Sequence, residues 1–179
     1  MKILLVGHFE NKWSTNVEMK KYFSRSGDQV TIFDYRKTAN FNIKFYEKNI
    51  LFIIFNKFLS FCRRVPLLKN NLARLYYKIQ GRSEMMDNLL KLKKKKFDLI
   101  IFIKTDTIDP SIISKFSTSH KTWYYFMDPP YVSFRINALE YVKNASYASS
   151  TFPCLVKNFK KLNKNSFHIR QGVDVDVFR

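Results

Sequence analysis

The stretch that decides the fold is residues 2–35, KILLVGHFENKWSTNVEMKKYFSRSGDQVTIFDY. It opens with a continuous apolar run, 2–7, of the kind found in strands buried on both faces of a parallel sheet. Residues 15–27 follow with helical spacing, Thr15 and Glu18 standing at capping-box positions and Gly27 in the place of a C-cap. Residues 29–35 form a second apolar run, so the stretch predicts a strand, a helix and a strand in one βαβ unit.

The same alternation resumes further along the chain. Asp109-Pro110 has the form of a helix start, with Asp as N-cap and Pro at the first helical position. Further strands are predicted at 97–104, 121–128, 145–151 and 166–170, and further helices at 133–144 and 152–163. We therefore predict an α/β fold: a three-layer, Rossmann-like, open parallel sheet of about six strands in a single domain, 1–179.

Residues 36–96 interrupt this alternation and are too long for a single crossover. They carry 16 Lys and Arg against 3 Asp and Glu, so most of the excess charge of the chain lies here. We predict a basic, helical insertion. The longest apolar run within it, 50–55, is far shorter than the roughly 20 residues that span a bilayer.

Three interpretations of this insertion remain open. Its helices can pack on the flank of the domain with solvated lysines, or they can form an oligomer or interdomain contact. Alternatively, an amphipathic helix over 41–64 can associate with an anionic membrane surface. In that case, apolar side chains would enter the lipid and basic ones would meet its head groups; the residues expected to do so are Phe52, Phe55, Lys57, Arg63 and Arg64.

The whole chain is strongly basic, with a net charge of +18, and such a field attracts phosphate-bearing partners. Cys62 and Cys154 stand apart without metal spacing, and we expect both to be reduced and buried. The three histidines are too scattered for a zinc site, so no metal is predicted. The N-terminus lacks the features of a signal peptide. These features predict a cytoplasmic protein, at the inner face of the membrane if the insertion binds lipid.

In an open α/β sheet, ligands bind beyond the carboxyl ends of the strands. The polar and aromatic side chains that follow the predicted strands suit a hydroxylated or phosphorylated ligand. They include His8, Lys12, Trp13 and Ser14; Lys104; Asp128 and Tyr131; Ser150; and Gln171, Gly172 and Asp174. The first loop has no GxGxxG pattern, and the chain lacks the phosphate-loop, serine-hydrolase and zinc-protease motifs, so no cofactor is predicted.

Four stretches carry a resemblance to a known family. KILLVG (2–7), YYFMDPP (124–130), ASYASST (145–151) and above all FHIRQGVDVDVF (167–178) resemble the N-terminal domain of GT-B glycosyltransferases. The nearest patterns are those of group-4-like and spore-maturation-like enzymes. Many group-4 enzymes have His-Asp at the end of the fourth strand, where this chain has Met127 and Asp128.

The resemblance implies a function and assigns roles to residues. It implies that this domain binds a glycan or lipid-linked acceptor and that a second domain, reached by a linker starting at 171–179, binds the nucleotide-sugar donor. Residues 1–179 alone would then be inactive. The implied acceptor residues are His8, Lys12, Trp13, Ser14, Lys104, Asp128 and Tyr131, and the implied donor-side residues are Ser150, Gln171, Gly172 and Asp174. The catalytic residues remain unassigned.

A second interpretation belongs to a different class. The chain can be a non-catalytic, basic, flavodoxin-like module that binds nucleic acid or a protein partner. The arrangement of charge separates the two interpretations. A basic stripe with exposed aromatic side chains across the loops of the sheet favours nucleic acid, whereas charge confined to 36–96 favours membrane binding or packing.

Overall fold

The computed structural model describes residues 1–9, 14–35, 82–105 and 108–170. Six strands in these ranges form one open sheet, in which every neighbouring pair is parallel. The strands are β1 (Lys2–Gly7), β2 (Gln29–Asp34), β3 (Leu99–Ile103), β4 (Thr122–Phe126), β5 (Tyr147–Ser150) and β6 (Ser166–His168). Their order is β2-β1-β3-β4-β5-β6, which confirms the predicted α/β fold with a parallel, Rossmann-like sheet.

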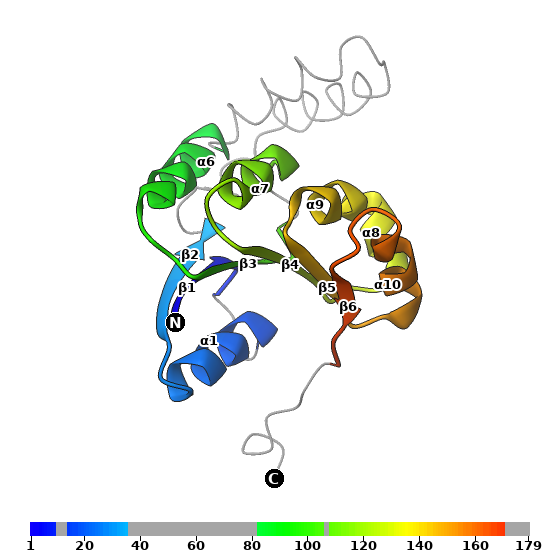
Figure 1. Ribbon diagram of the computed structural model, residues 1–179, viewed down its shortest axis with the longest axis horizontal. Coiled ribbons are helices and arrows are strands. Elements are labelled where there is room, and N and C mark those ends of the chain that lie inside the picture. The colour runs from blue at the N-terminus through cyan, green and yellow to red at the C-terminus, as the bar shows by residue number, and fades with distance from the viewer. Residues whose placement is uncertain (10–13, 36–81, 106–107, 171–179) are drawn as a thin grey trace, which may run out of the picture.

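Helices stand between consecutive strands and cover both faces of the sheet. The described helices are α1 (Thr15–Arg25), α6 (Arg82–Lys91), the 3-10 helix η1 (Leu92–Lys94), α7 (Pro110–Ser117), α8 (Pro130–Arg135), α9 (Ala138–Asn144) and α10 (Pro153–Lys160). Figure 1 shows α1 on one face of the sheet and the later helices on the other.

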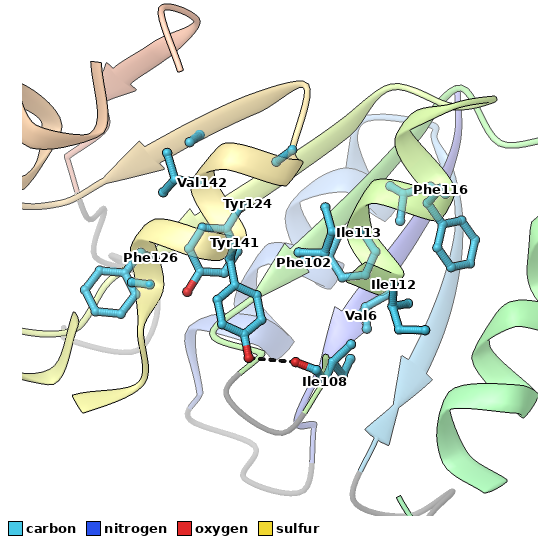
Figure 2. Packing of buried hydrophobic residues seen from close by; sticks show 14 of the residues in the cluster. Val6, Phe102, Ile108, Ile112, Ile113, Phe116, Tyr124, Phe126, Tyr141 and Val142 are labelled. Carbon is cyan, nitrogen blue, oxygen red and sulfur yellow. Dashed lines mark hydrogen bonds between the residues drawn. The ribbon is translucent and has the colours of Figure 1, made fainter. Parts of the chain in front are cut away.

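The larger core lies on the face that α6 to α10 cover. Its centre is aromatic: the ring of Tyr124 on β4 stacks on the ring of Tyr141 on α9, with 5.2 Å between centroids. Both side chains are almost fully buried, and the Tyr141 hydroxyl donates a hydrogen bond of 2.6 Å to the backbone carbonyl of Ile108 (Figure 2). The bond ties α9 to the loop before α7, so it also helps to fix the chain that follows β3.

The smaller core lies on the face that α1 covers. Alternate residues of β1 and β3, including Ile3, Leu5 and Ile101, point to this face and are fully buried. Met19 and Phe23, four residues apart on α1, pack against them. The continuous apolar runs predicted to be strands buried on both faces are therefore explained by two cores that share β1 and β3.

Of two predicted helix starts, one is confirmed and one is off by a residue. Asp109 is the N-cap of α7, as predicted, and its carboxylate accepts a hydrogen bond from the Ser111 amide. The cap of α1 was predicted one residue too late: Ser14, not Thr15, is the N-cap, and its hydroxyl accepts from the Val17 amide. Gly27 has a positive φ of 82° directly after α1, which agrees with its predicted role at the C-terminus of the helix.

The helix predicted over 133–144 is in fact two helices. α8 begins earlier, at Pro130, and ends at residue 135, and α9 begins at Ala138. Asn137 between them is left-handed, with φ 56° and ψ 47°, a conformation that cannot continue a right-handed helix. The side chains of 133–144 therefore do not share one helical face.

Only the last part of the basic insertion falls within the described residues. There, α6 buries Met85 and Leu89 in the larger core, which agrees with the interpretation of the insertion as helices on the flank of the domain. The membrane residues predicted between 41 and 64 lie outside the described residues. In the part of the chain that the structure describes, no helix has both the length and the apolar character needed to cross a bilayer.

Cys154 corrects a further prediction. Its thiol lies near the start of α10 and is exposed, not buried. The buried positions of α10 are Leu155, Val156 and Phe159, so Cys154 falls on the solvent side of the helix. Cys62 lies outside the described residues.

Candidate functional site

The carboxyl ends of all six strands lie along one edge of the sheet, because all the strands are parallel. β2 lies on one side of β1, and β3, the next strand in the chain, lies on the other side. The topological switch point therefore lies between β1 and β3. His8 follows β1 and Lys104 follows β3, and these two residues flank the switch point. Ligands of open α/β sheets bind at this place, and we therefore call the edge around His8, Lys104 and Asp128 the switch-point site.

A histidine and a carboxylate face each other on one side of this site. His8 Nδ1 lies 3.6 Å from Asp34 Oδ1, and the side chain of Asp34 is only 7% exposed. The other carboxylate oxygen, Oδ2, accepts a hydrogen bond of 3.1 Å from the backbone amide of Phe9. Asp34 is thus held from two directions. The Nδ1 side of His8 therefore faces a carboxylate.

The backbone next to His8 is fixed by α1. Asn16, in the first turn of α1, donates a hydrogen bond of 2.8 Å from Nδ2 to the His8 carbonyl. This approach is possible because residue 7 is glycine, since a Cβ built on Gly7 would lie 2.8 Å from Asn16 Nδ2. A short glycine at the end of β1 therefore lets α1 position the loop that carries the histidine.

An ion pair forms the other side of the site. Lys104 Nζ lies 2.8 Å from Asp128 Oδ2, so the ends of β3 and β4 are joined by opposite charges. The oxygen is buried but has no hydrogen bond, so the ammonium group lies off the direction in which a hydrogen bond would form. The Asp128 side chain is 16% exposed and that of Lys104 44%, so a ligand can reach the pair from solvent.

The backbone of Lys104 is strained. Its φ is +46°, one of two positive values among the non-glycine residues that the structure describes. Such a conformation costs on the order of 1 kcal/mol or more for a residue with a side chain. Two hydrogen bonds hold it: the Lys104 amide donates to the Tyr125 carbonyl, and the Tyr35 hydroxyl donates to the Lys104 carbonyl at 3.2 Å. Strain that surrounding residues maintain at a strand end is typical of functional sites.

Thr105 places a buried polar group directly after Lys104. Its side chain is fully buried, and its hydroxyl has no hydrogen-bond partner in the structure. A buried hydroxyl without a partner costs roughly 1–3 kcal/mol. Such groups are rare in folded proteins, and this one follows the strained Lys104 directly in the chain.

The structure brings together three of the predicted acceptor residues, His8, Lys104 and Asp128, at the switch-point site. Tyr131 lies nearby in sequence, on α8, and is 70% exposed. Ser14 caps α1, and Ser150 is fully buried, its hydroxyl accepting from the Phe152 amide in a turn. The other predicted site residues, Lys12, Trp13, Gln171, Gly172 and Asp174, lie outside the described residues.

Asp34 and Tyr35 contribute to the site but were not predicted. Asp34 is the last residue of β2 and Tyr35 follows it. The register of β1 and β2 pairs Gly7 with Asp34, which places the carboxylate beside His8. The usable signal in the sequence was an acidic residue at the end of an apolar strand, which is the same signal that singled out Asp128.

A shallow depression of about 710 Å³ lies at the opposite edge of the sheet, near the starts of β4 and β5. Polar groups of the protein itself occupy its lining. The Ser117 hydroxyl bonds to Thr122 and to the Asn144 carbonyl, and both ring nitrogens of His120 have partners within 3.0 Å. Because these groups already bond to one another, we favour the switch-point site over this depression.

The described residues contain no cluster of three or more His, Cys, Asp or Glu side chains that could hold a metal ion. Comparisons with protein-family models, with curated proteins and with solved structures found no match.

Proposed function

We propose that residues 1–179 form the N-terminal, acceptor-binding domain of a GT-B glycosyltransferase, of the group-4-like or spore-maturation-like kind, with a three-layer Rossmann-like core. The donor in such an enzyme is a nucleotide sugar held mainly by a second domain. The observation that supports the proposal best is the Lys104–Asp128 pair, with Nζ 2.8 Å from Oδ2, at the carboxyl ends of β3 and β4 beside the switch point of a parallel sheet.

The chemistry of the site suits a hydroxylated acceptor. Asp128 can accept a hydrogen bond from a hydroxyl group, and Lys104 can donate one to a hydroxyl or phosphate oxygen. His8, whose Nδ1 lies 3.6 Å from Asp34 Oδ1 at the end of β1, is the candidate general base for a reacting hydroxyl. A donor group, an acceptor group and a base on three neighbouring strand ends are what binding and activating an alcohol require.

Among the residues that the structure describes, the position of the basic run favours this proposal over a nucleic-acid module. The described basic run at Lys93–Lys96 lies toward the opposite edge of the sheet, where Lys93 donates to Thr118 and the Lys95 carbonyl contacts His120. A module that read nucleic acid through the strand-end loops would instead carry its basic side chains there.

A ligand titration of the full chain tests the proposal. Saturation-transfer NMR with the methyl glycosides of glucose, galactose, mannose and N-acetylglucosamine should detect saturable binding of at least one sugar. The Lys104→Ala and Asp128→Asn variants should weaken that binding roughly tenfold or more, because each removes a hydrogen bond to a charged group.

Lys115→Ala is the matched control, because Lys115 is an exposed lysine on α7 that makes no contact with the site. Its affinity for the bound sugar should equal that of the unaltered chain. Absence of saturable binding for the whole panel, or equal affinities in all three variants, contradicts the proposal.

A further inference from the structure

Two neighbouring aromatic side chains on α8 are exposed to solvent. Tyr131 is 70% and Phe134 72% exposed, the highest values among the large apolar side chains that the structure describes. Both stand on one short helix that begins at Pro130, two residues after Asp128. Isolated exposed apolar side chains are common, but adjacent ones indicate a surface that meets an apolar partner.

One side of α8 is exposed and the other is buried. Residues three apart lie on the same side of a helix, so Tyr131 and Phe134 share one side, while Val132 and Ser133 are buried on the other. The Ser133 hydroxyl donates 2.6 Å to the Pro130 carbonyl, and Val132 packs in the larger core. The helix thus buries Val132 and Ser133 on one side and exposes two aromatic rings on the other.

The chain between the ion pair and the rings is short and stiff. Asp128 is followed by Pro129 and Pro130, whose φ angles are fixed by their rings, and the Val132 amide closes the first turn on the Pro129 carbonyl at 3.0 Å. Tyr131 therefore comes three residues after the carboxylate, in a fixed turn that continues the switch-point site. A ligand on Lys104 and Asp128 that extended along this turn would meet the two rings.

We propose that Tyr131 and Phe134 form an aromatic rim that binds the apolar part of an amphiphilic acceptor, while its hydroxyl-bearing part lies on Lys104 and Asp128. This inference rests on the proposed function and narrows its substrate class to acceptors that carry an alkyl or aryl group beside the sugar. Aromatic rings suit such a group, because they supply a large apolar surface, and the tyrosine hydroxyl remains in water.

Two glycosides with the same head group test the inference on the full chain. Octyl β-D-glucopyranoside, kept below its micelle concentration, and methyl β-D-glucopyranoside are titrated by NMR, and the ratio of their dissociation constants is measured. We expect the octyl compound to bind roughly tenfold tighter or more, because several methylene groups would leave water. In the Tyr131→Ser/Phe134→Ser double variant, the ratio should fall close to one.

Tyr22→Ser is the matched control, because Tyr22 is a tyrosine of nearly equal exposure, 68%, on the distant helix α1. In the Tyr22→Ser variant, the ratio of the two dissociation constants should equal that of the unaltered chain. All the altered side chains are exposed, so thermal unfolding midpoints should stay unchanged, which separates lost contacts from lost folding.

Several results would overturn the inference. Equal affinities for the two glycosides in the unaltered chain would do so, and so would an unchanged ratio in the double variant. The double variant could instead lose flotation with phospholipid vesicles, or lose a concentration-dependent dimer, with no change in glycoside affinity. Such a result would assign the rings to membrane binding or to contact with a second copy of the chain. Failure of the proposed function would give a different result. The octyl glycoside would still bind more tightly than the methyl glycoside in the Lys104→Ala and Asp128→Asn variants, and these substitutions would not change the affinity for the methyl glycoside.

Discussion

At the scale of single residues, the site depends on a close approach between β1 and α1. Gly7 leaves the space that Asn16 needs to hold the His8 carbonyl, and His8 in turn faces Asp34 across the end of β2. The lack of a side chain at Gly7 thus permits the first of several contacts that position His8.

Gly7→Ala is the direct test of this arrangement. The added Cβ would lie 2.8 Å from Asn16 Nδ2, so α1 must shift or the hydrogen bond to His8 must break. We expect the free energy of unfolding to fall by about 1–3 kcal/mol, the usual cost of overpacking. Chemical denaturation measures the change.

The control for Gly7→Ala is Gly27→Ala, at a position where an added Cβ has open space but where φ is 82°. That variant should lose stability through backbone strain without disturbing the NMR signals of His8. Equal disturbance of His8 by both variants would contradict the role given to Gly7.

At the scale of elements, the strands were easier to predict from the sequence than the helix boundaries. The central strands β1, β3 and β4 are apolar runs buried by two cores, so composition alone marks them. The predicted strand ends extended too far at Lys104 and Asp128, because a strand pattern does not show where the chain leaves the sheet. The helix over 133–144 was wrong, because spacing could not show that Asn137 would adopt a left-handed conformation.

The switch-point site was predicted only in part, for a related physical reason. His8, Lys104 and Asp128 follow strands in the sequence, and the parallel sheet brings these strand ends together. The partner of His8, Asp34, depends on the register between β1 and β2, which is a long-range property. The strain at Lys104 and the unpartnered hydroxyl of Thr105 depend on tertiary contacts that have no signature in the local sequence.

Substitutions of Asn137 test the break between α8 and α9. Its φ of 56° is tolerated by asparagine and favoured by glycine. Asn137→Gly should leave the free energy of unfolding nearly unchanged or raise it slightly, whereas Asn137→Val should lower it by about 1–2 kcal/mol. Denaturant unfolding of the two variants measures the difference. If the valine variant equalled the glycine variant, residues 133–144 would form one continuous helix after all.

At the scale of the whole molecule, the sheet has two edges of different character. The carboxyl edge carries a strained lysine, an ion pair, a histidine beside a carboxylate and, on α8, two exposed aromatic rings. The opposite edge carries the depression of about 710 Å³, whose hydroxyls and histidine have hydrogen-bond partners within the protein, and the described lysine run at Lys93–Lys96. The proposed function assigns ligand binding to the first edge and only structural or electrostatic roles to the second.

The most direct test of this assignment is a map of amide chemical shifts of the full chain during titration with the glycoside that binds best. We expect saturable shifts around Gly7–Phe9, Lys104–Thr105 and Asp128, which extend to Tyr131 and Phe134 when the glycoside carries an octyl chain. Shifts centred instead on Ser117–Lys121 and Ser146, at the opposite edge, would contradict the proposed binding site, and so would a titration without saturable shifts at either edge.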